Sequence, residues 1–504
     1  MFNVKKPLSA LLASLMLLSG VTVFAGCAKG DETPDNAPVT TAPTEEETGE
    51  VDHRFDGIKF GGREFRIYTS AASNGLMDSS NFLIEGEGKT GGGLVSDAVF
   101  ARNVAVEEAL KVKLVFTQCE LGYGNIAADI RKYTQSGDDE FDLVINDNYD
   151  YAPLMIEGNF RNLLDEDCVF DFNREYWYKD YMDDLILMNG YQYLMAGDYF
   201  IDVLRTAHLL MVNKNLYKEY YQSSADELYD VVMNYEWTYD KLNTLISDIY
   251  TDRNNNGEKD AGDLFGFADG GTWGASIAFS ASGTTNFFTR DEDGIPTLTL
   301  HEGDRANQLA NAITTLFNNE SSSLNAAGGA VEVFTRGDSL VAGGFFLGTL
   351  ESEALRLMED EAAVLPYPML FASDKKYTTA THDTTELGAI LITSTDLNYI
   401  STVIEVLGRE TAKIVIPKYY KESLQVQCVD DEKAAAMIDI IHDNFDNAFV
   451  LAFNTALGGR LLQAFSDCAE KNREFSAVFA GSAKSVQNSL KVTIKKFQKN
   501  NNVD

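Results

Sequence analysis

The chain has 504 residues, 45% of them hydrophobic and 11% aromatic, which is enough for two or three packed domains. Its 41 basic and 77 acidic side chains give a formal net charge of −36. This charge repels nucleic acid phosphates, so we exclude nucleic acid as a partner.

The first residues have the pattern of a bacterial export signal. Two lysines precede an apolar run over 8–25, and the sequence FAGC at 24–27 resembles a lipobox, where the signal is removed and the new N-terminal cysteine is lipidated. We therefore expect 1–27 to be a lipoprotein signal peptide and Cys27 to be lipidated. The mature protein would then be held on the outer face of the cell membrane by its acyl chains. An uncleaved N-terminal membrane anchor is the alternative.

Residues 28–57 are predicted to form a disordered acidic tether. Between 28 and 52 the sequence has eight acidic side chains against one lysine, together with three prolines and five threonines. This composition cannot bury a core, and charge repulsion and proline keep such a segment extended. We expect the folded part to begin near Ile58.

Strands and helices alternate in the first third of the chain. Apolar runs predict strands at 65–69, 112–116 and 141–145, and helical patterns lie between them at 95–110 and 126–133. Strands joined by helical crossovers imply a largely parallel sheet covered on both faces. Ligands of such sheets bind beyond the carboxyl ends of the strands, which favours the loops that begin at Ser70 and Asn146.

The stretch 237–267 predicts a helix, an ion-binding loop and a strand. Thr238 is an expected N-cap, and the loop after the helix has oxygen-bearing side chains at positions 1, 3, 5, 9 and 12 of an EF-hand-like pattern, with a glycine at position 6. Position 7 would contribute its backbone carbonyl. The expected ligands of a structural Ca²⁺ ion are Asp252, Asn254, Asn256, Glu258, Asp260 and Asp263. A solvated turn without an ion is the alternative, because Asp263 is shorter than the usual glutamate. Trp237 precedes the N-cap, and we assign it to packing.

The remainder alternates between apolar strands and helices. Strands are predicted at 207–213, 340–346 and 388–392, and the chain is mostly helical from Thr402 onwards. The cysteines Cys119, Cys168, Cys428 and Cys468 have long, irregular spacings, which favours buried thiols, although their disulfide state stays open.

Several segments, in their order along one exported chain, carry a family resemblance. They are SDAVFARNVAVEEALKVKL, EFDLVINDNYDYAPLMIEGNFRNL, NGYQYLMAGDYFIDVLRTAHLLMVNKNLY, WTYDKLNTLISDIYTDRNNNGEKDAGDLFGF and AAVLPYP. The chain resembles the bacterial extracellular solute-binding proteins of family 1, the lipid-anchored receptors of ABC importers. The resemblance implies an α/β, two-lobed periplasmic-binding-protein-like fold of type II, in which each lobe is a mostly parallel sheet flanked by helices and crossover strands form the hinge.

Mapped onto this chain, the resemblance places lobe I at 58–198 and 363–410, and lobe II at 199–362 and 411–504. It implies a monomeric, non-catalytic receptor that binds a solute, most often a sugar or oligosaccharide, and delivers it to the transmembrane subunits of an ABC permease. The alternatives are a surface-anchored glycan hydrolase and a receptor for a non-sugar solute such as a peptide. The sequence has no G-x-S-x-G or H-E-x-x-H motif that would support a hydrolase.

The candidate ligand contacts are polar and aromatic residues expected at loop ends around the cleft. Carboxylates and amides bond to hydroxyl groups, and aromatic rings cover the apolar faces of sugars. The candidates are Ser70, Asn146, Asp147, Tyr149, Asp198, Tyr199, Trp273, Phe346, His382 and Asp383. Each could instead be a capping, turn or core residue.

Overall fold

The computed structural model describes residues 52–69, 84–86, 94–119, 125–270, 272–283, 285–324, 329–425 and 432–503, without the side chains at 94, 272–276 and 421–425. Residues Asp52–Asp504 form one compact unit. The predicted signal peptide, Cys27, Ser70, Cys428 and the side chain of Trp273 lie outside this description. Within it, no helix is both long enough and apolar enough to cross a membrane.

A four-stranded sheet has the strand order β11-β3-β1-β2. Its strands are β1 (Arg63–Thr69), β2 (Val112–Gln118), β3 (Leu143–Asp147) and β11 (Glu386–Ala389). β1 pairs in parallel with β2 and β3, and β11 pairs antiparallel with β3. The helices between the strands are α1 (Leu94–Leu110), α2 (Ile126–Ser136) and α3 (Asn148–Ile156). The predicted strand and helix alternation is confirmed, and α1 and α2 begin within a residue of their predicted starts, whereas α3 was not predicted.

A five-stranded sheet has the order β10-β4-β9-β5-β8. Its strands are β4 (His208–Asn213), β5 (Phe265–Asp269), β8 (Ser322–Leu324), β9 (Ser339–Phe346) and β10 (Ala362–Leu365). Two of its pairings are parallel and two are antiparallel, so this sheet is mixed and not mostly parallel as predicted. The antiparallel pairs both involve β4, which enters directly from a crossover segment. The predicted boundary at 363 cuts β10, although β10 pairs with β4 of this sheet.

Helices surround the five-stranded sheet, and a hairpin projects from it. The hairpin strands are β6 (Phe288–Arg290) and β7 (Pro296–Leu298). The helices are α6 (Lys214–Tyr221), α7 (Glu227–Met233), α8 (Tyr239–Ile246), α9 (Thr272–Ala281), α10 (Arg305–Phe317), α11 (Gly329–Thr335), η2 (Leu347–Glu351) and α12 (Glu353–Arg356). The predicted start of α8 is confirmed, because Thr238 Oγ1 accepts a hydrogen bond from Lys241 N at 3.3 Å. Trp237 is fully buried, and its Nε1 donates to Pro366 O at 2.9 Å, so its assignment to packing is confirmed.

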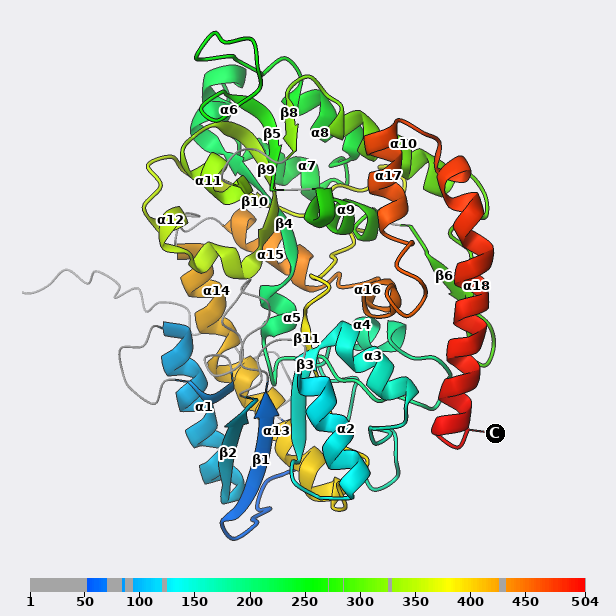
Figure 1. Ribbon diagram of the computed structural model, residues 1–504. Helices are drawn as coiled ribbons and strands as arrows, with labels where there is room; N and C mark the ends of the chain where they lie inside the picture. The colour runs from blue at the N-terminus through cyan, green and yellow to red at the C-terminus, as the bar shows by residue number, and fades with distance from the viewer. Residues whose placement is uncertain are drawn as a thin grey trace, which may run out of the picture. The chain divides into compact units, whose positions relative to one another are not determined.

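Three crossover segments meet where the two sheets approach each other. Helix α5 (Asp202–Arg205) leads into β4, and His208 N donates to Ala380 O while His382 N donates to Thr206 O. The segment at 379–382 also pairs with Phe445, beyond the end of α15. Figure 1 shows α5 and the start of β4 between β3 and β9. The crossover segments are therefore joined by an antiparallel bridge between Ala207 and Thr381 and by a parallel bridge between Thr379 and Phe445.

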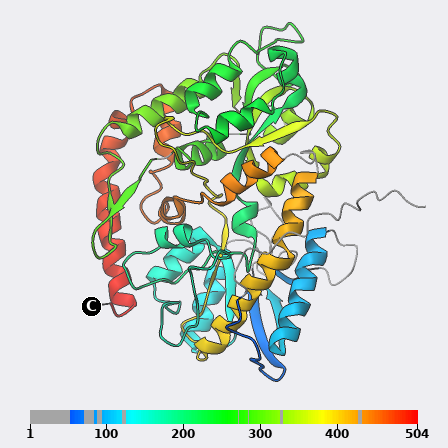
Figure 2. The same ribbon diagram turned by 180° about the vertical axis from the view of Figure 1, so that it is seen from behind.

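The last hundred residues are mostly helical, as predicted. The helices are α13 (Leu397–Ile414), α14 (Ile416–Gln425), α15 (Glu432–His442), α16 (Ala448–Phe453), α17 (Gln463–Lys471) and α18 (Phe475–Asn500). α18 packs on α10, α17 and β7, and at its other end on α3. There Asn500 Nδ2 donates to Ile156 O at 3.0 Å. Figure 2 shows the same helix from behind, along one side of the molecule. α18 therefore connects α3, which follows β3 of the four-stranded sheet, to helices α10 and α17 at the other end.

The packed part of the chain begins before the predicted end of the tether at residue 57. Asp52 and Phe55 are buried, and Arg54 forms ion pairs with Asp52 at 2.8 Å and with Glu405 of α13 at 2.6 Å. The acidic composition of 28–57 predicted a disordered tether, but it does not show that Arg54 pairs with both Asp52 and Glu405 and so fixes the end of this segment. Cys119, Cys168 and Cys468 are free thiols, and Cys119 and Cys468 are buried, as favoured, whereas Cys168 is half-buried.

Candidate functional site

Carboxylates from three different elements converge where β3 ends and β11 begins. Asp147 is the last residue of β3, and Glu386, the first residue of β11, is its register partner. Asp202 Oδ2, at the start of α5, accepts a hydrogen bond from Glu386 N at 2.9 Å. Asp383, in the crossover segment before β11, acts electrostatically on Asp147. We call Asp147, Asp202, Asp383 and Glu386 the acidic cluster.

Asp147 is 0% exposed, and neither of its carboxylate oxygens has a hydrogen-bond partner among the described residues. The Oδ1 atom of Asp202, also buried, has none either. A buried polar atom without a partner costs about 1–3 kcal/mol, so folded proteins keep few of them. Three such oxygen atoms lie together here, so this place is a candidate site for a ligand that would supply the missing hydrogen bonds.

The electrostatics follow from this burial. Desolvation by burial, followed by the nearby charges of Glu386 and Asp202, raises the pKa of Asp147 from its usual 3.8 to about 9. Burial also raises the pKa of Asp202 to about 6, although the hydrogen bond from Glu386 N and the charge of Arg205 oppose the rise. Burial away from water is the largest cause of both shifts, and neighbouring carboxylates add to the shift of Asp147.

Two histidines and an aromatic ring form the side of the site next to the five-stranded sheet. His382 Nδ1 lies 3.0 Å from Asp383 Oδ1, and the His382 ring lies 6.1 Å from that of His208 and 5.2 Å from that of Phe346. His208 is buried with no partner for either ring nitrogen among the described residues. Burial, followed by the charge of His382, lowers its pKa well below 6.5. His208 is therefore neutral at physiological pH.

Five of the predicted ligand contacts lie in or beside the acidic cluster. They are Asn146, Asp147, Phe346, His382 and Asp383. Asn146 and Asp147 were predicted in a loop, but they are the last two residues of β3 and are buried. The strand is displaced by two residues from the apolar run FDLVI, because it begins at Leu143 and pairing with β11 carries it through two polar residues. Tyr149 follows in the first turn of α3 and is half-buried.

Two predicted contacts lie outside the acidic cluster. Asp198 is buried and accepts a hydrogen bond from Tyr178 Oη at 2.7 Å, and Tyr199 is buried with its Oη donating to Met195 O at 2.9 Å. Both side chains have protein partners and pack in the interior. The sequence pattern misled here, since a glycine followed by polar and aromatic residues occurs in turns and in ligand loops alike.

Sequence reasoning missed Asp202, His208 and Glu386. The signal available was a charged or titratable residue that opens an otherwise apolar run, as in HLLMV and ELGAI. Such a residue has no obvious reason to be buried unless other polar groups surround it. Only the pairing of distant segments shows that these three residues lie at one place.

The EF-hand-like loop is compact and held by its own hydrogen bonds. Asp252 accepts from the backbone N–H groups of Asn256 at 3.3 Å and Gly257 at 2.8 Å, and Asn254 Nδ2 donates to Asp260 Oδ1 at 2.8 Å. Asp263 is buried and accepts from Arg253 N, Tyr250 Oη and Asp260 N. In the described part of the chain, no group of three or more His, Cys, Asp or Glu side chains is arranged as a metal site. The residue types fit Ca²⁺, but the amide nitrogens of Asn254 and Asn256 point toward Asp260, so an ion would require these amides to turn.

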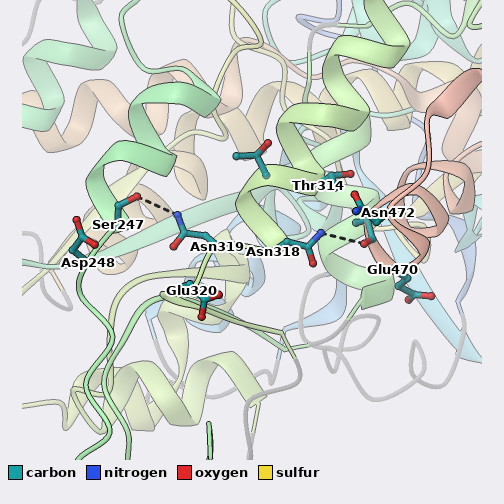
Figure 3. A pocket seen from close by; sticks show the side chains of 10 residues that line it. Ser247, Asp248, Thr314, Asn318, Asn319, Glu320, Glu470 and Asn472 are labelled. Carbon is teal, nitrogen blue, oxygen red and sulfur yellow. Dashed lines mark hydrogen bonds between the residues drawn. The ribbon is translucent and has the colours of Figure 1, made fainter.

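A surface pocket of about 650 Å³ lies apart from the acidic cluster, among the ends of α8, α10 and α17 (Figure 3). Asn319 Nδ2 donates to Ser247 Oγ at 3.1 Å, and Asn318 Nδ2 donates to Ala469 O at 3.3 Å. These polar side chains satisfy one another across the pocket. We therefore do not place the functional site there.

No sequence-family profile matches the chain, and no curated protein sequence matches it. Solved structures do match. The ABC substrate-binding protein Lmo0181 from Listeria monocytogenes in complex with cycloalternan has 13% identity and a TM-score of 0.52, with 85% of this chain and 99% of that chain covered. An ABC transporter solute-binding protein from Thermotoga lettingae bound with α-D-tagatose has 12% identity and a TM-score of 0.52, covering 85% and 100%.

A cyclo/maltodextrin-binding protein complexed with maltotetraose has 10% identity and a TM-score of 0.55, with 85% of this chain and 98% of that chain covered. At these identities the likeness concerns the fold. The chain has the two-domain α/β fold of periplasmic binding proteins, and its structural neighbours are ABC transporter solute-binding proteins.

Proposed function

We propose that this protein is an extracellular solute receptor that binds a sugar or oligosaccharide between its two lobes and delivers it to an ABC importer. The observation that carries the proposal is the acidic cluster with its unpartnered, buried Asp147 at the carboxyl end of β3. In open α/β sheets, ligands bind outside the carboxyl ends of strands. The structural neighbours named above are solute-binding proteins whose complexes contain cycloalternan, tagatose and maltotetraose.

The site has contributions from both sheets, and this suggests how it works. Asp147 and Glu386 belong to the four-stranded sheet, whereas His208 and Phe346 belong to the five-stranded sheet. A ligand that contacts both groups binds the closed arrangement more tightly than the open one, and this difference in affinity shifts the population toward closure. Ligand binding would thereby present a closed receptor to the permease.

The membrane part of the proposal rests on the sequence. The FAGC motif at 24–27 and the acidic segment after it support a lipid anchor that faces outside, with an extended tether to the folded unit. The test is to express the full chain and its Cys27→Ala variant in a bacterium that processes lipoproteins. The parent should fractionate with membranes and the variant should not. Equal membrane association of both would contradict the lipid anchor.

The receptor role is tested by thermal shift with a panel of α- and β-linked oligosaccharides, neutral and amino-substituted. A ligand at about 100 times its Kd stabilises the folded state by about 2.7 kcal/mol, which raises the melting temperature measurably. Every sugar that stabilises the protein is then incubated with it and analysed by mass spectrometry. Unchanged sugar supports a receptor, and shortened sugar would identify a hydrolase. If no sugar stabilises the protein, the sugar receptor proposal fails.

We also propose that the loop 252–263 holds a structural Ca²⁺ ion. The oxygen-bearing residues at alternate positions and the turn at Gly257, whose φ is +78°, support it. Extracellular modules of this kind bind Ca²⁺ at about 10⁻⁴–10⁻³ M, so the loop would be filled outside the cell without acting as a sensor. The loop belongs to the segment between α8 and β5, so the ion would stabilise that part of the fold.

A further inference from the structure

The acidic cluster has more negative charge than the described residues can balance. The charged and titratable groups around Asp147 come from several elements. They include Asp150 and Tyr151 of α3, Tyr199 before α5, Asp202 and Arg205 of α5, Glu351 of η2, His382 and Asp383 of the crossover, Glu386 of β11 and His208 of β4. The carboxylates among them outnumber the arginines several-fold. Their repulsion has to be relieved either by protons or by a positive ligand.

The arginines that reach this region already have carboxylate partners. Arg205 forms a bidentate pair with Glu351, with Nε and one terminal nitrogen each 2.9 Å from a carboxylate oxygen. Arg131, whose charge acts on Asp150, pairs with Glu157 at 2.6 Å and 3.0 Å. Both guanidinium groups are therefore engaged, and neither donates a hydrogen bond to Asp147, whose oxygens are unpartnered among the described residues.

A second observation, independent of the carboxylates, points to a missing polar ligand. His208 is 1% exposed, both of its ring nitrogens lack a partner among the described residues, and its ring lies 6.1 Å from that of His382, which contacts Asp383. Asn146 Oδ1, beside Asp147, is also buried without a described partner. Neutral His208 has one donor and one acceptor nitrogen, and Asn146 Oδ1 is a further acceptor, so a ligand with several N–H or O–H groups would supply the missing partners.

Part of the cluster is exposed to solvent. The side chain of Asp383 is 23% exposed and that of His382 is 10% exposed, whereas Asp147 is fully buried. Phe346, half-buried, lies against His382 at 5.2 Å between ring centroids. The cluster therefore has an exposed carboxylate and an aromatic ring beside its buried members.

We propose that the bound solute places a protonated amine against Asp147 and Asp202, so that its class is an amino sugar or an oligosaccharide that contains one. A neutral hydroxyl group can donate one hydrogen bond to a carboxyl oxygen, but it brings no positive charge and so leaves Asp147 protonated. An ammonium group donates three hydrogen bonds and also neutralises the charge. This inference rests on the proposed function, because it assumes that a sugar-like solute occupies this site.

Release of a proton from Asp147 on binding would distinguish an amine ligand from a neutral sugar. Free Asp147 is protonated at neutral pH, because its pKa is raised to about 9 by burial and by the neighbouring carboxylates. An ammonium group favours the ionised form, so binding expels one proton, and affinity rises by about tenfold per pH unit while the amine stays charged. A neutral sugar favours no such release, and its affinity would stay level or fall as the pH rises.

The test compares three sets of β-1,4-linked oligosaccharides of equal length by calorimetry on the purified full chain. They are glucosamine oligomers, N-acetylglucosamine oligomers and cello-oligosaccharides, which differ in the group at C2. Titrations run between about pH 4.5 and about pH 6, where the amino group of glucosamine stays charged. We expect the glucosamine oligomers to bind at least about 30-fold more tightly than the others, with affinity rising with pH. Titration in buffers of different ionisation enthalpy should show release of about one proton.

The decisive variant is Asp147→Asn, which keeps the shape and removes the charge. It should weaken the glucosamine oligomers by about 30-fold or more and change any neutral sugar by much less. The matched control is Asp184→Asn, because the pKa of Asp184 is also raised to about 6 by burial, but its carboxylate accepts a hydrogen bond from Phe449 N at 2.8 Å. The control should bind like the parent, and melting curves of both variants verify that they fold.

The outcomes separate the two proposals. If neutral sugars bind and glucosamine oligomers do not, or if Asp147→Asn leaves amine binding unchanged, the amine inference is overturned and the receptor role stands. If no sugar of any class binds, the receptor proposal fails as well.

Discussion

Glu386 faces Asp147 directly across the antiparallel pairing of β11 and β3, so two carboxyl side chains share one face at the end of a buried sheet. Like charges in directly opposed positions are destabilising. The chain keeps this pair in spite of that cost, and next to it are Asp202, His382 and Asp383 from the crossover segments. A solute that supplies hydrogen-bond donors or positive charge at this place would reduce the repulsion between these carboxyl groups.

The first prediction concerns stability against pH. The pKa of Asp147 is higher in the folded chain, about 9, than its usual 3.8, so between these values the folded form binds a proton that the unfolded form does not. Stability in the absence of ligand should therefore fall as the pH rises from about 4 to about 9. The Asp147→Asn variant binds no proton at this position on folding. Its free energy of unfolding should exceed that of the parent by about 1–3 kcal/mol at pH 8, and this difference should shrink toward pH 4. Urea denaturation at several pH values measures it, and a variant less stable than the parent at pH 8 would contradict it.

The second prediction concerns the loop 252–263. Removing Ca²⁺ with a chelator should lower the melting temperature by about 1–3 °C, because an ion bound only to the folded state stabilises it by mass action. The affinity for the solute should change little, since the loop lies between α8 and β5, away from the acidic cluster. Asp252→Asn should have the lower melting temperature from the start and should not respond to the chelator. A parent protein indifferent to both Ca²⁺ and chelator would rule out the ion.

The third prediction concerns Trp237. Its Nε1 donates to Pro366 O in the buried interior, and so it joins the start of α8 to the chain after β10. Trp237→Phe leaves that carbonyl without its donor and should cost about 1–3 kcal/mol of unfolding free energy, whereas Trp237→Ala should cost about 3–5 kcal/mol. Tyr235→Phe nearby is the control, because Tyr235 is 38% exposed and should change stability by less than about 0.5 kcal/mol. Equal effects of Trp237→Phe and Tyr235→Phe in chemical denaturation would contradict the assignment.

The fourth prediction concerns the contact between α18 and α3. Gly158 has φ +80°, and a Cβ atom there would lie 2.7 Å from Asn500 O at the end of α18. Gly137 has φ +79° with nothing within 4 Å of the same position. Both alanine variants lose stability from the backbone conformation, but Gly158→Ala should lose about 1–3 kcal/mol more, because α18 has to move.

Hydrogen exchange identifies the cause of that difference. Gly158→Ala should speed exchange at the C-terminal end of α18, where Asn500 and Asn501 bond to the carbonyls of Ile156 and Met155, and Gly137→Ala should leave it unchanged. If both variants exchange alike along α18, the helix does not depend on this contact.

The sequence by itself determined the local elements and the chemistry at their ends. Apolar runs and helical periodicity predicted β1 to β3, α1, α2 and α8 with its Thr238 cap, because such elements bury one face and end where the pattern ends. The order of the segments led to the two-lobed α/β fold. Asn146, Asp147, Phe346, His382 and Asp383 were candidates because they follow or end buried strands.

Only the tertiary structure decided which polar residues share a site. Asp202, His208 and Glu386 come from three separate stretches, and their proximity depends on the antiparallel pairing of β11 with β3 and on the crossover at 206–208 and 380–382. The same pairing buries Asp147, while other contacts turn Asp198 and Tyr199 into packed interior residues. Long-range strand pairing is set by the sum of many weak contacts across the whole core, and no short pattern in a sequence contains that sum.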